Sequence, residues 1–158
     1  FKVNAELHTA IDIIKQKISP QTVIVFPDEW AKKRFWKNFL DFENIYCSKQ
    51  RIDDKRIITI NWWDVLDKEV LIVDDLIQSW GTIIETAKKL KELWAKSVSA
   101  FATHGVFVED SLDKLSLNLD KIYTTDTLAK NHNLKSINNN LEVLSIKKLV
   151  QSKILRII

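Results

Sequence analysis

Glycine is scarce in this sequence. The 158 residues contain two glycines, where an average usage of about 7% would give about eleven. Tryptophan is correspondingly abundant, with six residues. A protein with many turns needs glycine, because glycine adopts positive φ angles without steric cost. The composition therefore raises the question of how this chain makes its turns.

Other absences exclude whole classes of protein. One cysteine, Cys47, excludes a disulfide framework and fits a reducing compartment. No run approaches 18 apolar residues and no signal peptide is visible. The net charge of +3 argues against a nucleic-acid partner, which usually requires a concentrated basic patch. We therefore expect a cytoplasmic protein with neither a nucleic-acid nor a membrane partner, forming one domain over residues 1–158.

The most informative stretch is V-L-I-V-D-D-L-I-Q-S-W-G-T at residues 70–82. Its first four residues, 70–73, form an apolar, largely β-branched run that predicts a central strand buried on both faces. Asp74 and Asp75 follow at the point where we expect this strand to end. From Thr82 onward, apolar residues recur at i, i+4 and i+7, which predicts an amphipathic helix.

The order of strand, acidic pair, polar loop and helix suits a phosphorylated sugar. Ligands of open α/β sheets bind at the carboxyl ends of strands, where a helix N-terminus offers N–H groups to an anion. Ser79 and Thr82 add hydroxyl groups, while Asp74 and Asp75 can accept hydrogen bonds from sugar hydroxyls or help to hold Mg²⁺. Two adjacent carboxylates can equally cap the strand and the helix, so the residues alone leave both interpretations open.

The rest of the chain alternates strands with helices. Strands are expected at residues 22–26, 45–47, 57–60, 98–103, 121–124 and 141–145, helices at 4–17, 29–40 and 146–158, and polar connections or turns at 48–56, 61–68 and 138–140. This alternation predicts an α/β fold with a mainly parallel sheet and helices on both faces. Asp28 is a second carboxylate at a strand end. His104 also follows a strand, and a lone histidine there favours a hydrogen-bonded structural role.

These motifs resemble those of a known family. The stretch at residues 70–82 is similar to the ribose-phosphate loop of the phosphoribosyltransferase fold. T-H-G-V-F at residues 103–107 narrows the resemblance to the ribose-phosphate diphosphokinases, or phosphoribosyl pyrophosphate synthetases. D-D-L-I-Q-S at residues 74–79 and F-P-D-E-W-A-K-K-R-F at residues 26–35 are most similar to the plant-type branch. The resemblance covers nearly the whole chain.

The resemblance implies transfer of the β,γ-diphosphoryl group of ATP to the anomeric hydroxyl of ribose 5-phosphate, with Mg²⁺. It assigns the ribose hydroxyls to Asp74 and Asp75, and a Mg²⁺ contact to Asp28. Lys49 and Arg51 fall where the family carries a K-x-R on a flexible loop over the phosphates, which implies catalytic stabilisation of transition-state charge. The 5-phosphate is assigned to the loop residues Gln78, Ser79, Trp80, Gly81 and Thr82.

The resemblance also implies a larger assembly. The family's enzymes resemble two such domains in tandem, with the ATP site between them, and this chain is similar to the C-terminal domain. We therefore expect the N-terminal domain to be missing from these 158 residues, and the complete protein to form a homo-oligomer. Alone, the chain should bind ribose 5-phosphate without turnover.

Two other functions stay open. A non-catalytic regulatory or binding subunit of the same family would keep the fold without the chemistry. A stand-alone phosphoribosyltransferase would share the D-D loop but consume the diphosphate sugar. T-H-G-V-F and the K-x-R segment argue against the phosphoribosyltransferase.

Several tryptophans stand where the family carries glycine or another small residue. Trp80 lies in the phosphate loop, Trp94 just past a helix where glycine is preferred, Trp30 within P-D-E-W-A, and Trp62 and Trp63 in a turn. We hypothesise that the host reads UGA as glycine and that conceptual translation decoded these codons as tryptophan. The rival hypothesis is that the substitutions are real and mark a degenerate subunit. UGG codons at positions 80 and 94 would exclude the first hypothesis.

Overall fold

The structure, a computed structural model, describes residues 10–52, 55–59, 65–77, 81–108, 110–128 and 139–146. Its strands are β1 (Val23–Phe26), β2 (Asn44–Tyr46), β3 (Ser48–Ile52), β4 (Lys55–Thr59), β5 (Glu69–Ile77), β6 (Ser97–Gly105), β7 (Lys121–Thr125) and β8 (Leu141–Leu144). Its helices are α2 (Glu29–Phe35), α3 (Gly81–Glu92), α4 (Ser111–Asn118) and the 3₁₀ helix η1 (Trp36–Phe39), and residues 10–15 are also helical.

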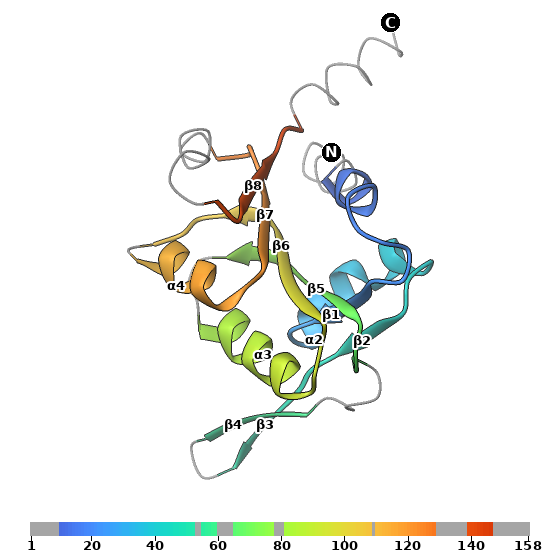
Figure 1. Ribbon diagram of the computed structural model, residues 1–158, viewed down its shortest axis with the longest axis vertical. Helices are drawn as coiled ribbons and strands as arrows, with labels where there is room; N and C mark the ends of the chain where they lie inside the picture. Colours follow the sequence, from blue (N-terminus) through green and yellow to red (C-terminus); the bar gives the residue numbers. More distant parts are fainter. Residues whose placement is uncertain are drawn as a thin grey trace, which may run out of the picture.

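The strands form one large parallel sheet and one small hairpin (Figure 1). The large sheet has six strands in the order β2-β1-β5-β6-β7-β8. Every pairing in it is parallel. The prediction of an α/β fold with a mainly parallel sheet is therefore confirmed.

Helices cover both faces of the sheet (Figure 1). One buried cluster joins α3 and α4 to the sheet, and the other joins α2 and the helical residues 10–15 to its opposite face. The central strand β5 contributes Val70 and Ile72 to the first cluster and Leu71 and Val73 to the second. All four side chains are at most 1% exposed, which confirms a strand buried on both faces.

The sheet has a topological switch point between β1 and β5. The chain leaves β1 through α2 on one face, and leaves β5 through α3 on the other. The pairing of β1 with β5 ends at Val25 and Ile72, whereas β5 stays paired with β6 as far as Ile77 and Gly105. Such a switch point opens a crevice at the carboxyl ends of the strands, where ligands of this class of fold bind.

One expectation for residues 48–60 is wrong, and another is confirmed. The expected polar connection at 48–56 contains β3 and the start of β4, which pair as an antiparallel hairpin from Ser48 and Thr59 to Ile52 and Lys55. The strand expected at 57–60 is present as β4, which belongs to this hairpin. A polar sequence can adopt this form because a two-stranded ladder pairs backbone groups without needing an apolar core.

Helix α4 was not expected from the sequence. Leu112 and Leu115 are its buried apolar residues, at a spacing of three, while Leu117 is 84% exposed. A helix of eight residues with two buried apolar side chains shows too little apolar periodicity to be predicted from the sequence. The helix expected at 29–40 is α-helical only as far as Phe35 and continues as η1.

Several other expectations fall outside the described residues. They include the terminal helix beyond Ile146, the first part of the helix at 4–17, and the pair Trp62 and Trp63. Within the described ranges, every helix is too short or too polar to cross a bilayer.

Trp94 closes α3 in a conformation that favours glycine. The N–H of Ala95 donates to the carbonyl of Leu90 at 3.1 Å, and the N–H of Trp94 donates to that of Lys91 at 3.0 Å. These two bonds define a Schellman motif with Trp94 at the C′ position. Trp94 has a φ of 63°, and its side chain is 77% exposed. The prediction that Trp94 occupies a position where helices prefer glycine is therefore confirmed.

Candidate functional site

A cavity of about 750 Å³ lies at the carboxyl ends of β1 and β5, at the switch point of the sheet. It is lined by Asp28, Trp30, Ala31, Lys33, Arg34, Asp74, Asp75, Leu76, Thr82 and Ile83. Four of the predicted site residues thus converge on one cavity from three separate segments of the chain. These four are Asp28, Asp74, Asp75 and Thr82.

Asp28 joins β1 to α2. It follows the strand by two residues and is the N-cap of the helix, where its Oδ1 accepts a hydrogen bond from the N–H of Ala31 at 3.0 Å. The preceding residue, Pro27, has no N–H to donate to a sheet. The prediction of a second carboxylate at a strand end is confirmed, and the cap fixes its orientation at the rim of the cavity.

Replacing Asp28 by alanine is expected to lower the free energy of unfolding by about 1 kcal/mol, because the helix loses its N-cap acceptor. Asp28→Asn keeps an acceptor oxygen at the same position and should stay close to the original stability. Urea denaturation of the three proteins measures the difference. Equal stability of the alanine and asparagine variants would contradict the capping role.

Asp74 and Asp75 lie within β5 rather than after it, which corrects the expected strand end. The strand continues to Ile77 because β6 extends equally far beside it, with Asp74 opposite Ala102. Successive residues of a strand point to opposite faces, yet both carboxylates line the cavity. Beyond Ile72, β5 no longer pairs with β1. The edge of β5 that carries the two carboxylates therefore faces the cavity. The backbone N–H of Asp75 also donates to Oδ1 of Asp74 at 2.8 Å.

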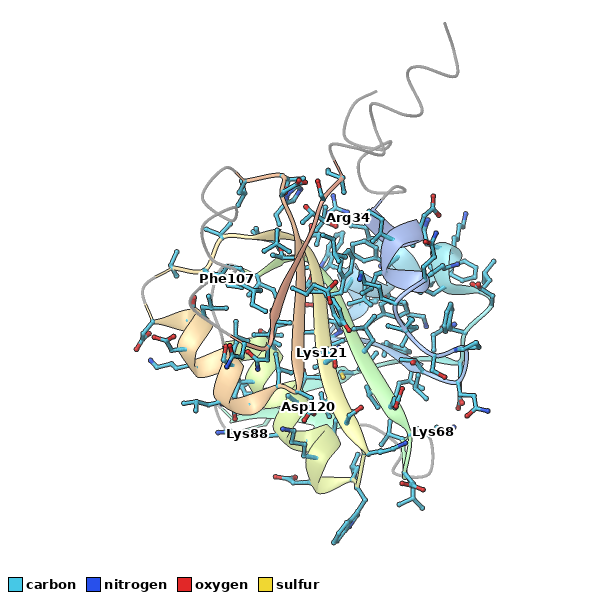
Figure 2. The ribbon with its side chains drawn as sticks, turned by 45° about the horizontal axis from the view of Figure 1, so that its top comes forward. Arg34, Lys68, Lys88, Phe107, Asp120 and Lys121 are labelled. Carbon is cyan, nitrogen blue, oxygen red and sulfur yellow. The ribbon has the colours of Figure 1, made fainter. Side chains whose placement is uncertain are left out.

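Arg34 was not predicted as a site residue. It lies in the last turn of α2, and its guanidinium Nη1 forms an ion pair with Oδ2 of Asp75. Figure 2 places Arg34 toward the carboxyl end of the sheet, whereas Lys68 marks the amino end of β5. The sequence feature that could have indicated Arg34 is the run of three basic residues, K-K-R, in the helix that follows Asp28.

The phosphate loop is only partly described. Helix α3 begins at Gly81, one residue before its predicted start, and Thr82 lines the cavity from the first turn of this helix. The carbonyl of Thr82 accepts a hydrogen bond from Oγ1 of Thr86 at 2.9 Å. Gln78, Ser79 and Trp80 lie outside the described residues. Their assignment to the 5-phosphate stays a prediction.

Lys49 and Arg51 belong to the hairpin strand β3, not to a loop. Their backbones pair with those of Ile58 and Arg56, respectively. A single residue, Cys47, separates the end of β2 from the start of the hairpin. Because β2 runs parallel to β1 and β5, the hairpin starts at the same edge of the sheet as the cavity. The catalytic assignment of Lys49 and Arg51 stays a prediction.

His104 has the hydrogen-bonded role that its sequence context favours. Its Nδ1 lies 2.8 Å from Oγ1 of Thr127, whose neighbour Thr125 donates from Oγ1 to the carbonyl of Thr103 at 2.6 Å. These hydrogen bonds connect the end of β6 to the residues that follow β7. His104 also pairs with Leu76 of β5, which lines the cavity.

The cavity supplies oxygen ligands for a hard cation. Within the described part of the chain, no group of three or more histidine, cysteine, aspartate or glutamate side chains is placed to hold a metal ion alone. Mg²⁺ does not require such a group, since it is usually bound by one or two carboxylates together with substrate phosphates. One or two of the carboxylates that line the cavity would suffice to hold a Mg²⁺ ion that arrives with a phosphorylated ligand.

Comparison with known proteins identifies the family. Residues 43–158 match the phosphoribosyl synthetase-associated domain. The chain belongs to this family. Chloroplastic ribose-phosphate pyrophosphokinase 3 of Oryza sativa subsp. japonica is 40% identical over 111 residues, which are 67% of this chain and 27% of that protein. Ribose-phosphate pyrophosphokinase of Campylobacter jejuni is 34% identical over 151 residues, which are 92% of this chain and 47% of that protein.

Solved structures agree with this assignment. Phosphoribosylpyrophosphate synthetase from Mycobacterium smegmatis superimposes with a TM-score of 0.67 at 28% identity, covering 87% of this chain and 45% of that protein. Hypoxanthine-guanine phosphoribosyltransferase from L. donovani has a TM-score of 0.54 at 11% identity, over 75% of this chain and 74% of that one. The latter shows the phosphoribosyltransferase fold alone. This phosphoribosyl synthetase-associated domain spans less than half the length of the synthetases and pyrophosphokinases compared here.

Proposed function

We propose that this chain supplies the ribose 5-phosphate half of a ribose-phosphate diphosphokinase. The complete enzyme transfers the β,γ-diphosphoryl group of ATP to the anomeric hydroxyl of ribose 5-phosphate. The observation that carries the proposal is the convergence of Asp28, Asp74, Asp75 and Thr82 on one cavity at the switch point. The names of the relatives support the same reaction.

Each side of the cavity suits one part of the sugar phosphate. The carboxylates of Asp74 and Asp75 accept hydrogen bonds from the ribose hydroxyls. The first turn of α3 offers unpaired N–H groups and the Thr82 hydroxyl to the 5-phosphate, which the helix dipole also favours. The preceding residues Gln78, Ser79, Trp80 and Gly81 complete this phosphate loop in the proposal.

The transfer itself needs alignment and positive charge more than covalent help from the protein. Asp28 contributes to holding Mg²⁺, which neutralises charge on the transferring phosphates when bound. Lys49 and Arg51 stabilise the charge that develops in the transition state. ATP binds between this domain and the N-terminal domain of the complete enzyme.

We further propose that the complete enzyme is a cytoplasmic homo-oligomer. Cys47 is the single cysteine of the sequence, which excludes a disulfide within the chain and fits a reducing compartment.

Calorimetry with ribose 5-phosphate and Mg²⁺ tests the site on this chain. We expect binding by the original chain, and a loss of about tenfold in affinity for Asp74→Asn, because a charged acceptor of a sugar hydroxyl becomes neutral. Glu92→Gln is the matched control, since it removes one negative charge at the far end of α3. Absence of ribose 5-phosphate binding by both the original chain and a Trp80→Gly version, with both folded, would contradict the proposal.

A non-catalytic binding subunit is the second candidate, and the bulk of Trp30 favours it. This side chain lines the cavity and is 81% exposed, where the resemblance leads us to expect a small residue. A Trp80→Gly version of the chain separates the two functions in the same calorimetric experiment. Binding by the glycine version alone would mean that Trp80 is either a decoding artefact or an inactivating change. Equal binding by both versions favours the enzyme.

A further inference from the structure

The ion pair between Arg34 and Asp75 joins two elements across the mouth of the crevice. Arg34 comes from α2, which follows β1, and Asp75 comes from the part of β5 that β1 no longer accompanies. Both side chains line the cavity. The guanidinium therefore holds the carboxylate at the place where the sheet opens.

This contact is poorly suited to a purely structural role. The side chains of Arg34 and Asp75 are 52% and 40% exposed, and exposed ion pairs add little to folding stability. A guanidinium is, in contrast, well suited to orient a carboxylate, because its N–H groups lie in one rigid plane. It also offsets one of the three negative charges of Asp28, Asp74 and Asp75, which would together repel an anionic ligand.

We propose that Arg34 is a positioning residue that holds the Asp75 carboxylate for the ring hydroxyls of the sugar. The pair Arg34–Asp75 then selects ribose 5-phosphate over a sugar phosphate that lacks a ring hydroxyl. This inference rests on the proposed function, since it assumes that a sugar phosphate occupies the cavity. Arg34 acts through Asp75 and not by binding the 5-phosphate.

Binding of three ligands to this chain tests the inference: ribose 5-phosphate, 2-deoxyribose 5-phosphate and inorganic phosphate, each with Mg²⁺. The lost positive charge affects all three anions alike, so Arg34→Ala is expected to weaken ribose 5-phosphate binding about tenfold more than it weakens binding of the deoxy sugar and of phosphate. The preference for ribose is thereby lost. Asp75→Asn should lose the same preference, and adding Arg34→Ala to it should reduce the preference for ribose no further.

Lys33→Ala is the matched control. It removes the same charge from the same helix and cavity, but Lys33 pairs with Glu29 at 3.0 Å and not with Asp75. We expect it to weaken both sugar phosphates equally and to preserve the preference for ribose. Arg34→Gln provides a second variant if Arg34→Ala does not melt cooperatively.

The outcomes of these binding experiments distinguish a positioning role of Arg34 from direct binding of phosphate, and both from failure of the proposed function. An equal loss for all three ligands in Arg34→Ala means direct binding of phosphate and overturns the positioning role. Additive losses of the preference for ribose in the Arg34→Ala, Asp75→Asn double variant overturn it as well. Either result leaves the proposed function standing, because the original chain still binds ribose 5-phosphate. Absence of binding by both the folded original chain and a folded Trp80→Gly version overturns the proposed function and the positioning role together.

Discussion

The free energy of unfolding is expected to fall by about 3 kcal/mol when Gly105 is replaced by alanine. A Cβ at this position would lie 2.3 Å from Cε2 of Phe107 and 2.7 Å from Oγ1 of Thr124. Phe107 is 8% exposed and Thr124 is fully buried, so both are held by the packing around them. In a close-packed interior neither side chain can move aside without displacing others. Urea denaturation measures the loss.

Gly81 offers the matched control for this substitution. An added Cβ there would have no atom within 4 Å among the described residues beyond Gly81 and its own helix. Gly81→Ala is expected to be neutral or to raise the free energy of unfolding by up to about 1 kcal/mol, because alanine restricts the unfolded chain. Similar losses from both substitutions would show that the effect at Gly105 does not come from its contacts with Phe107 and Thr124.

Trp94→Gly is expected to raise the free energy of unfolding by about 1.5 kcal/mol, whereas Gly105→Ala lowers it. The left-handed conformation costs a residue with a Cβ about 1–2 kcal/mol, and glycine removes this cost. Little packing is lost, since the Trp94 side chain is 77% exposed. Thermal and urea denaturation of the two proteins give the difference.

Two variants separate the backbone effect from the loss of the indole ring. Trp94→Ala removes the ring but keeps a Cβ at φ 63°, so we expect stability close to the original. Trp30→Gly removes a similarly exposed ring from the first turn of α2, where φ is helical and glycine costs up to about 1 kcal/mol. A gain in stability for Trp30→Gly, or none for Trp94→Gly, would contradict the argument.

These variants bear on the hypothesis that UGA codons were read as tryptophan. The Schellman motif at Trp94 is a position for which glycine is the favoured residue, independently of any family resemblance. For Trp30, the structure supports the hypothesis only by showing that the side chain is exposed. Trp80 lies outside the described residues. The hypothesis therefore predicts UGA at position 94, and the coding sequence is its direct test.

Much of the fold and part of the site could be predicted from the sequence. The apolar run at 70–73 marked the central strand because a strand buried on both faces has no polar side. Asp28 and Asp74 could be placed at one edge because the carboxyl ends of parallel strands meet there. The ends of β5 could not be predicted, since its last residues depend on pairing with β6 as far as Gly105.

Arg34 shows what local patterns miss. Its sequence context is that of an exposed helix, and a basic residue in the last turn of a helix is ordinary. Its ion pair with Asp75 depends on where α2 lies relative to β5, which is a tertiary property. The hairpin β3–β4 was missed for a related reason, since cross-strand pairing, and not apolar periodicity, defines it.

The large sheet ends in two short edge strands, β2 with three residues and β8 with four. A short edge presents few unpaired N–H and C=O groups, so it is a poor template for a strand from another molecule. Copies of this chain are therefore expected to assemble through helix or loop surfaces, and the hydrogen-bonded sheet should not continue from one subunit into the next. The same property protects the chain from edge-to-edge aggregation at high concentration.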